Sequence, residues 1–157
     1  MMTKKRKAYI IVSWILVFAC MGVIFYMSSQ PANESQAMSD GLLQKIMDLF
    51  HIEISSFIIR KAAHMTEFLG LALLLFNSIY ATSETKFTPY IAWGVTFLYA
   101  ISDEVHQIFV ECRACQFRDM LIDGTGAILG VLIGLIILII YKKIKERGKK
   151  NGDIKSV

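Results

Sequence analysis

An uncharged apolar run near the start of the chain is the feature that most limits how it can fold. Residues 8–27 contain no Asp, Glu, Lys or Arg, and residues 120–141 contain only Asp123. A helix that crosses the hydrocarbon core of a bilayer needs about 20 predominantly apolar residues, so both runs predict transmembrane helices. Residues 58–80 and 90–110 are each apolar over one half and charged over the other, and we expect them to span the membrane too.

These runs predict an all-α integral membrane protein built as a bundle of four transmembrane helices. Charged residues make up 19% of the chain, against about 25% in an average soluble domain. The first apolar run is longer than the roughly 7–15 residues of a signal-peptide core, so we expect it to be retained. The expected organisation is a basic segment 1–7, a membrane domain 8–141 and a polar, fraying basic tail 142–157.

Residues 32–56 form the first loop between the predicted spans. Within it, apolar residues recur at helical spacing and polar residues lie between them. This pattern predicts a short amphipathic helix at the membrane surface, with Ser39 or Asp40 as its N-cap. Two roles are compatible with this helix: an ordinary packed segment of the loop, or a functional lid. The apolar positions are Leu42, Leu43, Ile46, Leu49 and Phe50.

The distribution of basic residues predicts the orientation in the membrane. Lys and Arg favour the cytoplasmic side of short loops. If both termini are cytoplasmic, the inner segments hold 12 of the 17 Lys and Arg residues but only three of the 13 Asp and Glu residues. We therefore expect a multi-pass protein of the cell membrane with both termini in the cytoplasm. This asymmetry explains the net charge of +4 and removes nucleic acid as an expected partner.

Three glycines at four-residue intervals lie on the fourth predicted span. Gly126, Gly130 and Gly134 form a small-residue stripe, which lets another helix approach closely. We expect packing within the chain, and a homodimer remains open.

Ionisable residues gather at one end of the second, third and fourth predicted spans. Arg60, His64 and Glu67 share one helical face by their i, i+4 and i+7 spacing. The predicted topology brings these ends of all three spans to the outer face of the membrane. Because a charge within the membrane costs at least about 2.5–3.5 kcal/mol, these residues must face one another or a wet cavity. The sequence therefore predicts one polar pocket between these spans, open to the outer face.

The residue types of this pocket fit an anionic headgroup. Arginine binds phosphate or carboxylate through paired hydrogen bonds, and carboxylate–histidine pairs suit proton transfer or a metal. The alternative is that the charges only pair with one another and fix the register of the helices. A divalent metal is compatible with the pocket, and the sequence does not decide whether the protein is an enzyme. The candidate catalytic residues are His64, Glu67, Asp103, Glu104 and His106. The candidate ligand-binding residues are Arg60, Lys61, Gln107, Arg113, Arg118, Asp119 and Asp123.

Two cysteines lie in the predicted outer loop. Cys112 and Cys115 form a C-x-x-C pair, which can form a disulfide in an oxidising exterior. Two free thiols are the alternative. No second pair is present to complete a zinc site of four ligands, and Cys20 lies within the first predicted span.

Several short motifs follow one another along the chain: Tyr-Met-Ser-Ser-Gln at 26–30, Arg-Lys-Ala-Ala-His at 60–64 followed by Glu67 and Phe68, Ser-Asp-Glu-Val-His-Gln at 102–107, Arg113, Arg-Asp-Met-Leu-Ile-Asp at 118–123, and Gly126. In this order they resemble the VanZ-like family, which is named for a protein linked to teicoplanin resistance. Two departures from the family pattern concern the pocket. The family commonly has Pro-Gly where this chain has Glu111-Cys112, which puts the loop shape in doubt, and asparagine where it has Asp123.

The resemblance implies a role at the cell envelope and, as in some members, reduced susceptibility to teicoplanin-type glycopeptides. It supplies no established reaction. We expect the pocket to bind or process an anionic, phosphate-bearing lipid headgroup. The expected partners are membrane lipids, with lipid-linked wall precursors or a glycopeptide as candidates. The alternative is a non-enzymatic membrane protein that limits antibiotic access or partners with the wall-synthesis machinery. An ion-coupled transporter is less favoured because the chain has no internal repeat.

Overall fold

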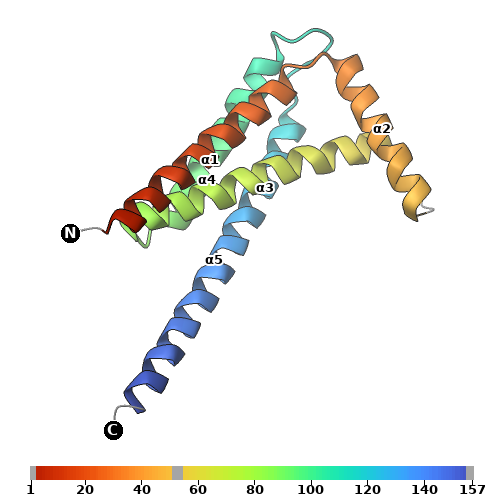
Figure 1. Ribbon diagram of the computed structural model, residues 1–157. Coiled ribbons are helices and arrows are strands. Elements are labelled where there is room, and N and C mark those ends of the chain that lie inside the picture. Colours follow the sequence, from red (N-terminus) through yellow and green to blue (C-terminus); the bar gives the residue numbers. More distant parts are fainter. Residues whose placement is uncertain (1–2, 51–54, 155–157) are drawn as a thin grey trace.

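The computed structural model describes residues 3–50 and 55–154, and no β-strand occurs within these ranges. The described chain forms five helices in series (Figure 1). This confirms the all-α prediction. The helices are α1 (Lys4–Ser28), α2 (Ala32–Phe50), α3 (Ser56–Ser83), α4 (Thr88–Gln107) and α5 (Phe117–Ile154).

Three of the described helices are long and apolar enough to cross a membrane. They are α1, α3 over Phe57–Ser83, and α5 over Phe117–Gly148. α4 has 20 residues but is not among them. The membrane character of the protein is therefore shown, whereas the fourth span stays a prediction.

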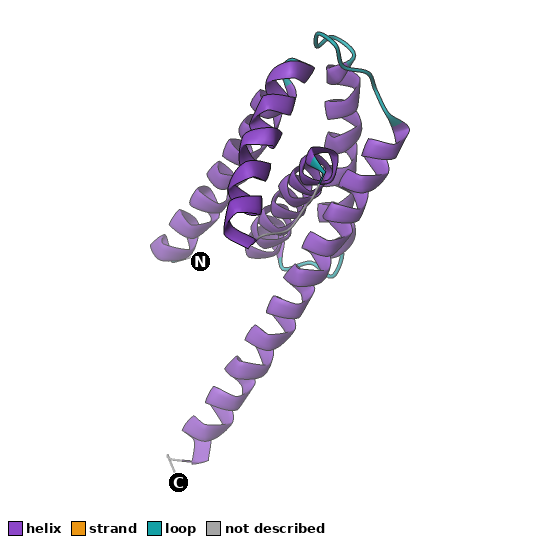
Figure 2. Cartoon of the chain, turned by 90° about the vertical axis from the view of Figure 1, so that its right-hand side faces the viewer, coloured by secondary structure: helices purple, strands orange, loops and turns teal. Residues whose placement is uncertain are grey.

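α3 is the central helix of the bundle. α1, α4 and α5 each pack against it, α4 also packs on α5, and α2 rests on its N-terminal part. The side chains that α3 buries are all apolar or small, and Phe68, Leu71 and Ala72 are fully shielded. α5 extends well beyond the other helices, as Figure 2 shows.

The glycine stripe of α5 packs on α3. A Cβ added at Gly126 would lie 2.3 Å from the carbonyl oxygen of Met65, and one added at Gly130 would lie 2.3 Å from that of Leu69. Real Cβ atoms do not approach this closely, so only glycine allows the two backbones to meet here. The prediction of packing within the chain is confirmed.

The bundle has two distinct ends. At one end the Ser28 side chain bonds to Asp103 and Lys61 pairs with Asp119, which joins the end of α1, the start of α3, the end of α4 and the start of α5. We call this the polar end. At the opposite end Arg6 of α1 pairs with Glu84, the C-cap of α3. We call this the basic end, since it also includes the N-terminal lysines of α1.

α2 differs from its predicted form. It starts at Ala32 and has 19 residues, so Ser39 and Asp40 lie inside the helix and the predicted N-cap was wrong. The Ser39 hydroxyl donates to the carbonyl of Ser35, 2.9 Å away, one turn earlier. The side chains of Leu42 and Leu49 are exposed, and the location of this helix at a membrane surface stays a prediction.

The basic tail also differs from its predicted form. α5 continues as helix to Ile154 instead of fraying after residue 141. Lys, Arg and Glu are good helix formers, and a helix already formed over residues 117–141 can be extended without a new nucleation step.

Candidate functional site

A polar cavity of about 310 Å³ lies at the polar end. It is enclosed by the start of α3, the end of α4, the loop that follows α4 and the start of α5. We call it the polar cavity. Its lining residues are Ala32, Arg60, Lys61, His64, Gln107, Cys112, Arg113, Ala114, Gln116 and Asp119.

A second cavity of about 120 Å³ lies under α2, and we call it the α2 cavity. It is bounded by the end of α1, the middle of α2 and the start of α3. It has Arg60, His64 and Arg113 in common with the polar cavity. The two spaces therefore meet at a basic junction. The remaining lining residues are Met27, Ser35, Met38, Ser39, Leu42, Ile59, Ala63 and Glu67.

The three cations of the polar cavity differ in their partners. Arg60 donates from Nη1 to Oε1 of Gln36, 3.1 Å away on α2. Lys61 forms an ion pair and hydrogen bond with Asp119. Neither Arg60 nor Arg113 has an ion pair among residues 3–50 and 55–154. Two guanidinium groups at the junction are thus not neutralised by direct contact with a described carboxylate.

Arg113 lies in the loop outside the helices and is partly buried. Burial lowers the pKa of its guanidinium from the ordinary value, against the opposing effect of the nearby Asp103 carboxylate. The buried charge of Arg113 is therefore costly, and an anion in the cavity would offset that cost.

Two buried polar atoms in the wall of the polar cavity lack a protein partner. They are Nδ1 of His64 and Oδ1 of Asp119, and neither has a hydrogen bond within the described part of the chain. Buried polar groups in proteins are nearly always hydrogen-bonded. The wall of the cavity is therefore suited to polar contents.

Asp103 and Glu104 are buried between helices and do not line either cavity. Oδ2 of Asp103 accepts hydrogen bonds from the Ser28 hydroxyl at 2.7 Å and from Nε2 of Gln107 at 3.1 Å. Oε2 of Glu104 accepts from the backbone N–H of Gln116 at 2.8 Å. These contacts tie α4 to α1 and to the following loop. They give both carboxylates a positioning role in the packing of the bundle.

Three more predicted site residues lie away from both cavities. His106 stacks on Phe25 of α1 with ring centroids 4.4 Å apart, and its Nε2 is 3.1 Å from the Ser29 hydroxyl. Asp123 is completely buried in α5, and neither carboxylate oxygen has a partner in the described ranges. Arg118 is exposed, with its guanidinium carbon 5.6 Å from the centre of the Phe57 ring.

Sequence patterns did not predict some of the residues that hydrogen-bond to the candidate site residues. Ser28 and Ser29 belong to the motif at 26–30, but nothing in their spacing predicted contacts with α4. Gln36 and Gln116 carry no sequence signal of their own. Each lies on a segment whose path depends on tertiary packing.

Cys112 and Cys115 are exposed and free, which is the alternative that the sequence left open beside a disulfide. Because both thiols are accessible, their pairing in an oxidising exterior stays a prediction. Cys112 adopts a φ of 56°, in the left-handed region that glycine favours. The loop thus keeps a glycine-type backbone at the position where the family commonly has glycine.

The divalent metal that the sequence left open has no evident site among the described residues. No three His, Cys, Asp or Glu side chains gather there in a way that could hold an ion. The polar cavity is lined by three cationic side chains, by the imidazole of His64 and by the carboxylate of Asp119.

The long apolar helices and the buried charges between them define an all-helical membrane protein with a polar interior at one end. A family model described as VanZ/LLP1 matches residues 13–139, which include most of α1, all of α2, α3 and α4, and most of α5. The chain belongs to the VanZ-like family. No curated protein and no solved structure matches the chain significantly.

Proposed function

We propose that this VanZ-like protein binds an anionic amphiphile of the cell envelope, with a phosphate in the polar cavity and the adjoining hydrocarbon in the α2 cavity. The observation that carries the proposal is the junction at Arg60, His64 and Arg113, where a polar space and a largely apolar one meet. A lipid-linked phosphate has the same succession of charge and hydrocarbon.

The charge of the polar cavity favours an anion. Arg60, Lys61 and Arg113 line it, and Asp119 is its one acidic lining residue among those described. Arginine presents a planar set of donors that matches a phosphate. The volume of about 310 Å³ is at the lower end of the range of small-molecule pockets, as expected for a headgroup alone.

α4 completes the membrane domain as a fourth span in this proposal. Its 20 residues measure about 30 Å as an α-helix, which matches the hydrocarbon core. Thr96 and Asp103 are buried in the bundle, whereas Tyr90, Leu98 and Val105 are exposed. A helix with its polar residues inside and its apolar residues outside suits a lipid environment. With four spans, the basic residues direct both termini to the cytoplasm and the polar cavity to the outer face.

This location connects the site to glycopeptides. Teicoplanin-type antibiotics act at the outer face of the cell membrane on lipid-anchored wall precursors. A protein that binds a lipid-linked phosphate there would change the supply or accessibility of those precursors. We therefore propose that the protein contributes to reduced susceptibility to teicoplanin-type glycopeptides. His64 and Glu67 line the cavities and are able to transfer a proton if the bound lipid is also processed.

Binding of farnesyl phosphate to the purified, detergent-solubilised protein tests the proposal. Arg113→Gln should weaken binding at least about 10-fold, because a charge-assisted hydrogen bond contributes about 1.5–3 kcal/mol. Arg147→Gln is the matched control, since Arg147 is exposed near the far end of α5. Farnesol, which lacks the phosphate, should bind far more weakly. Equal binding of the two compounds, or equal effects of the two substitutions, would reject the proposal.

A non-enzymatic role with a purely structural charge cluster is the second candidate. The bonds of Asp103 to Ser28 and Gln107 favour it for that residue. Asp103→Asn should lower the amount of protein in the membrane, whereas Arg113→Gln should leave that amount unchanged and reduce glycopeptide tolerance. Parallel loss of protein and tolerance in both variants would favour the structural role for the whole cluster.

A further inference from the structure

The largest of the three cavities described lies at the basic end, far from the site proposed above. It has a volume of about 460 Å³. α3 forms its floor, α1 forms one wall and α5 forms the other. The cavity lies where α1 and α5 both pack on α3.

Most of its lining is aromatic or aliphatic. Phe76 and Tyr80 come from α3, and Ile137, Leu138 and Tyr141 come from α5. Ile137 and Tyr141 are also more than half exposed, so the cavity is open at the side of the bundle that a bilayer would cover. A hydrocarbon chain from the surrounding lipid can therefore enter it sideways.

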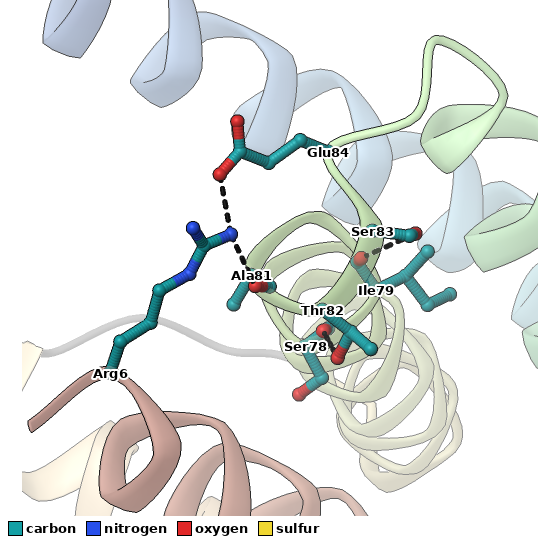
Figure 3. Close-up of polar contacts among 7 residues, drawn as sticks. All are labelled: Arg6, Ser78, Ile79, Ala81, Thr82, Ser83 and Glu84. Atoms are coloured by element: carbon teal, nitrogen blue, oxygen red, sulfur yellow. Dashed lines mark hydrogen bonds and ion pairs between the residues drawn. The ribbon is translucent and has the colours of Figure 1, made fainter. Parts of the chain in front are cut away.

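The rim of the cavity is polar and is built by contacts between α1 and α3. Arg6 reaches from α1 across to the end of α3, where it pairs with Glu84 at 2.5 Å and donates to the carbonyl of Ala81 at 3.3 Å (Figure 3). Deeper in, the Tyr9 hydroxyl donates to Oδ1 of Asn77 at 2.7 Å. These bonds hold the start of α1 against α3 and define one edge of the opening.

The opposite edge carries a further cation. Nζ of Lys142 lies 5.7 Å from the centre of the Tyr80 ring, and Tyr80 lines the cavity. Arg6 and Lys142 together outnumber Glu84. Further exposed cations lie on α1 and α5 beyond the rim, so the opening has an excess of positive charge. They are Lys4, Lys5, Lys7, Lys143 and Lys145.

The depth of the rim also fits a headgroup. Residues 120–141 of α5 measure about 33 Å at 1.5 Å per residue, which is close to the thickness of the hydrocarbon core. Lys142 is the first charged residue after this segment. The rim therefore lies at the level where lipid phosphates meet water, while the apolar lining lies among the acyl chains.

We propose that this cavity is a specific site for one anionic phospholipid, with an acyl chain along Tyr80, Ile137 and Leu138 and the phosphate beside Lys142 and Arg6. Basic pockets between helices on the cytoplasmic side of membrane proteins bind anionic lipid headgroups, and the predicted orientation puts the basic end on that side. The site is separate from the polar cavity and does not depend on the function proposed there.

Native mass spectrometry of the full-length protein tests this site. After addition of phosphatidylglycerol or phosphatidylcholine in equal amounts, the protein should retain one phosphatidylglycerol molecule with at least fivefold preference. Lys142→Gln should reduce that retention about fivefold. The matched control is Lys145→Gln, which removes a charge that is also exposed but does not lie over Tyr80. Ile137→Trp, which narrows the cavity, should also reduce retention while the helical circular dichroism stays the same.

Three results would overturn the proposal. Equal retention of both lipids would show that the charge of the headgroup is not recognised. Equal losses in Lys142→Gln and Lys145→Gln would show only general attraction to the basic surface. A third result is a dimer mass without bound lipid for the unmodified protein that is absent for Ile137→Trp. It would show that a second copy of the chain occupies the cavity.

Discussion

At the scale of single residues, the pairing of Lys61 with Asp119 limits the charge that the polar cavity can offer. Asp119 pairs with one of the three cations that line the cavity, and it carries the one negative charge among the described lining residues. Asp119→Asn should release Lys61 and tighten binding of farnesyl phosphate about 3- to 10-fold, as measured by titration of the purified protein. Lys61→Gln should weaken it. Weaker binding in Asp119→Asn would mean that the carboxylate is needed to hold Lys61 in place.

The left-handed backbone of Cys112 makes a second prediction at this scale. A non-glycine residue in this region is strained by about 1–2 kcal/mol, and part of this is offset by the greater freedom of glycine in the unfolded chain. Cys112→Gly should therefore stabilise the protein by up to about 1 kcal/mol, seen as a higher thermal unfolding midpoint in detergent.

Cys115 provides the control for that substitution. It is also an exposed free thiol, but its φ is not positive. Cys115→Gly should leave the protein equally stable or less stable. A similar rise in both variants would show that loss of a thiol, and not relief of backbone strain, is responsible.

Helical spacing predicted which residues share a face, but not which neighbour that face would meet. Arg60, His64 and Glu67 do line the cavities, as their spacing indicated. Asp103 and His106 of α4 both contact α1 instead of lining a cavity, since Asp103 bonds to Ser28 and His106 stacks on Phe25. Spacing along α4 could not show this, because it depends on how α1 packs against α4.

At the scale of helices, the glycine stripe sets the distance between α3 and α5. Gly130→Ala should destabilise the protein by about 2–3 kcal/mol, since an added Cβ would overlap the Leu69 carbonyl oxygen and force the helices apart. Thermal unfolding in detergent measures the effect. Gly70→Ala is the control because Gly70 lies on α3 with nothing near its Cβ position. It should stabilise the helix by about 0.5–1 kcal/mol. Similar behaviour of the two variants would refute a close helix contact at Gly130.

The existence of the helices could be predicted more reliably than their ends. Long apolar runs predicted α1, α3 and α5 because a bilayer-spanning segment is a strong compositional signal. The start of α2 was missed because Ser39 and Asp40 have cap-forming side chains that also fit inside a helix. The length of α5 was missed because charged residues with good helix propensity look like a solvated tail when only hydropathy is considered.

At the scale of the whole molecule, the orientation of the bundle depends on α4. The polar end joins the end of α4 to the start of α3, so α4 runs antiparallel to α3 and alongside it. With α1, α3, α4 and α5 all crossing, the number of spans is even and the termini share a side. With α4 left on the surface, the number is odd and the two ends of α5 exchange sides.

Labelling of intact cells with a membrane-impermeant maleimide distinguishes these topologies. In a background with the other cysteines replaced, Cys115 should be labelled from outside, because four spans and cytoplasmic termini put the loop after α4 at the outer face. Lys86→Cys and Lys143→Cys should react only after permeabilisation, since Lys86 lies between α3 and α4 and Lys143 follows the last apolar segment. External labelling of Lys143→Cys alone would indicate three spans. External labelling of both substituted positions, with Cys115 protected, would indicate four spans in the inverted orientation and would place the polar cavity on the cytoplasmic side, where it could not act on outer-leaflet lipids.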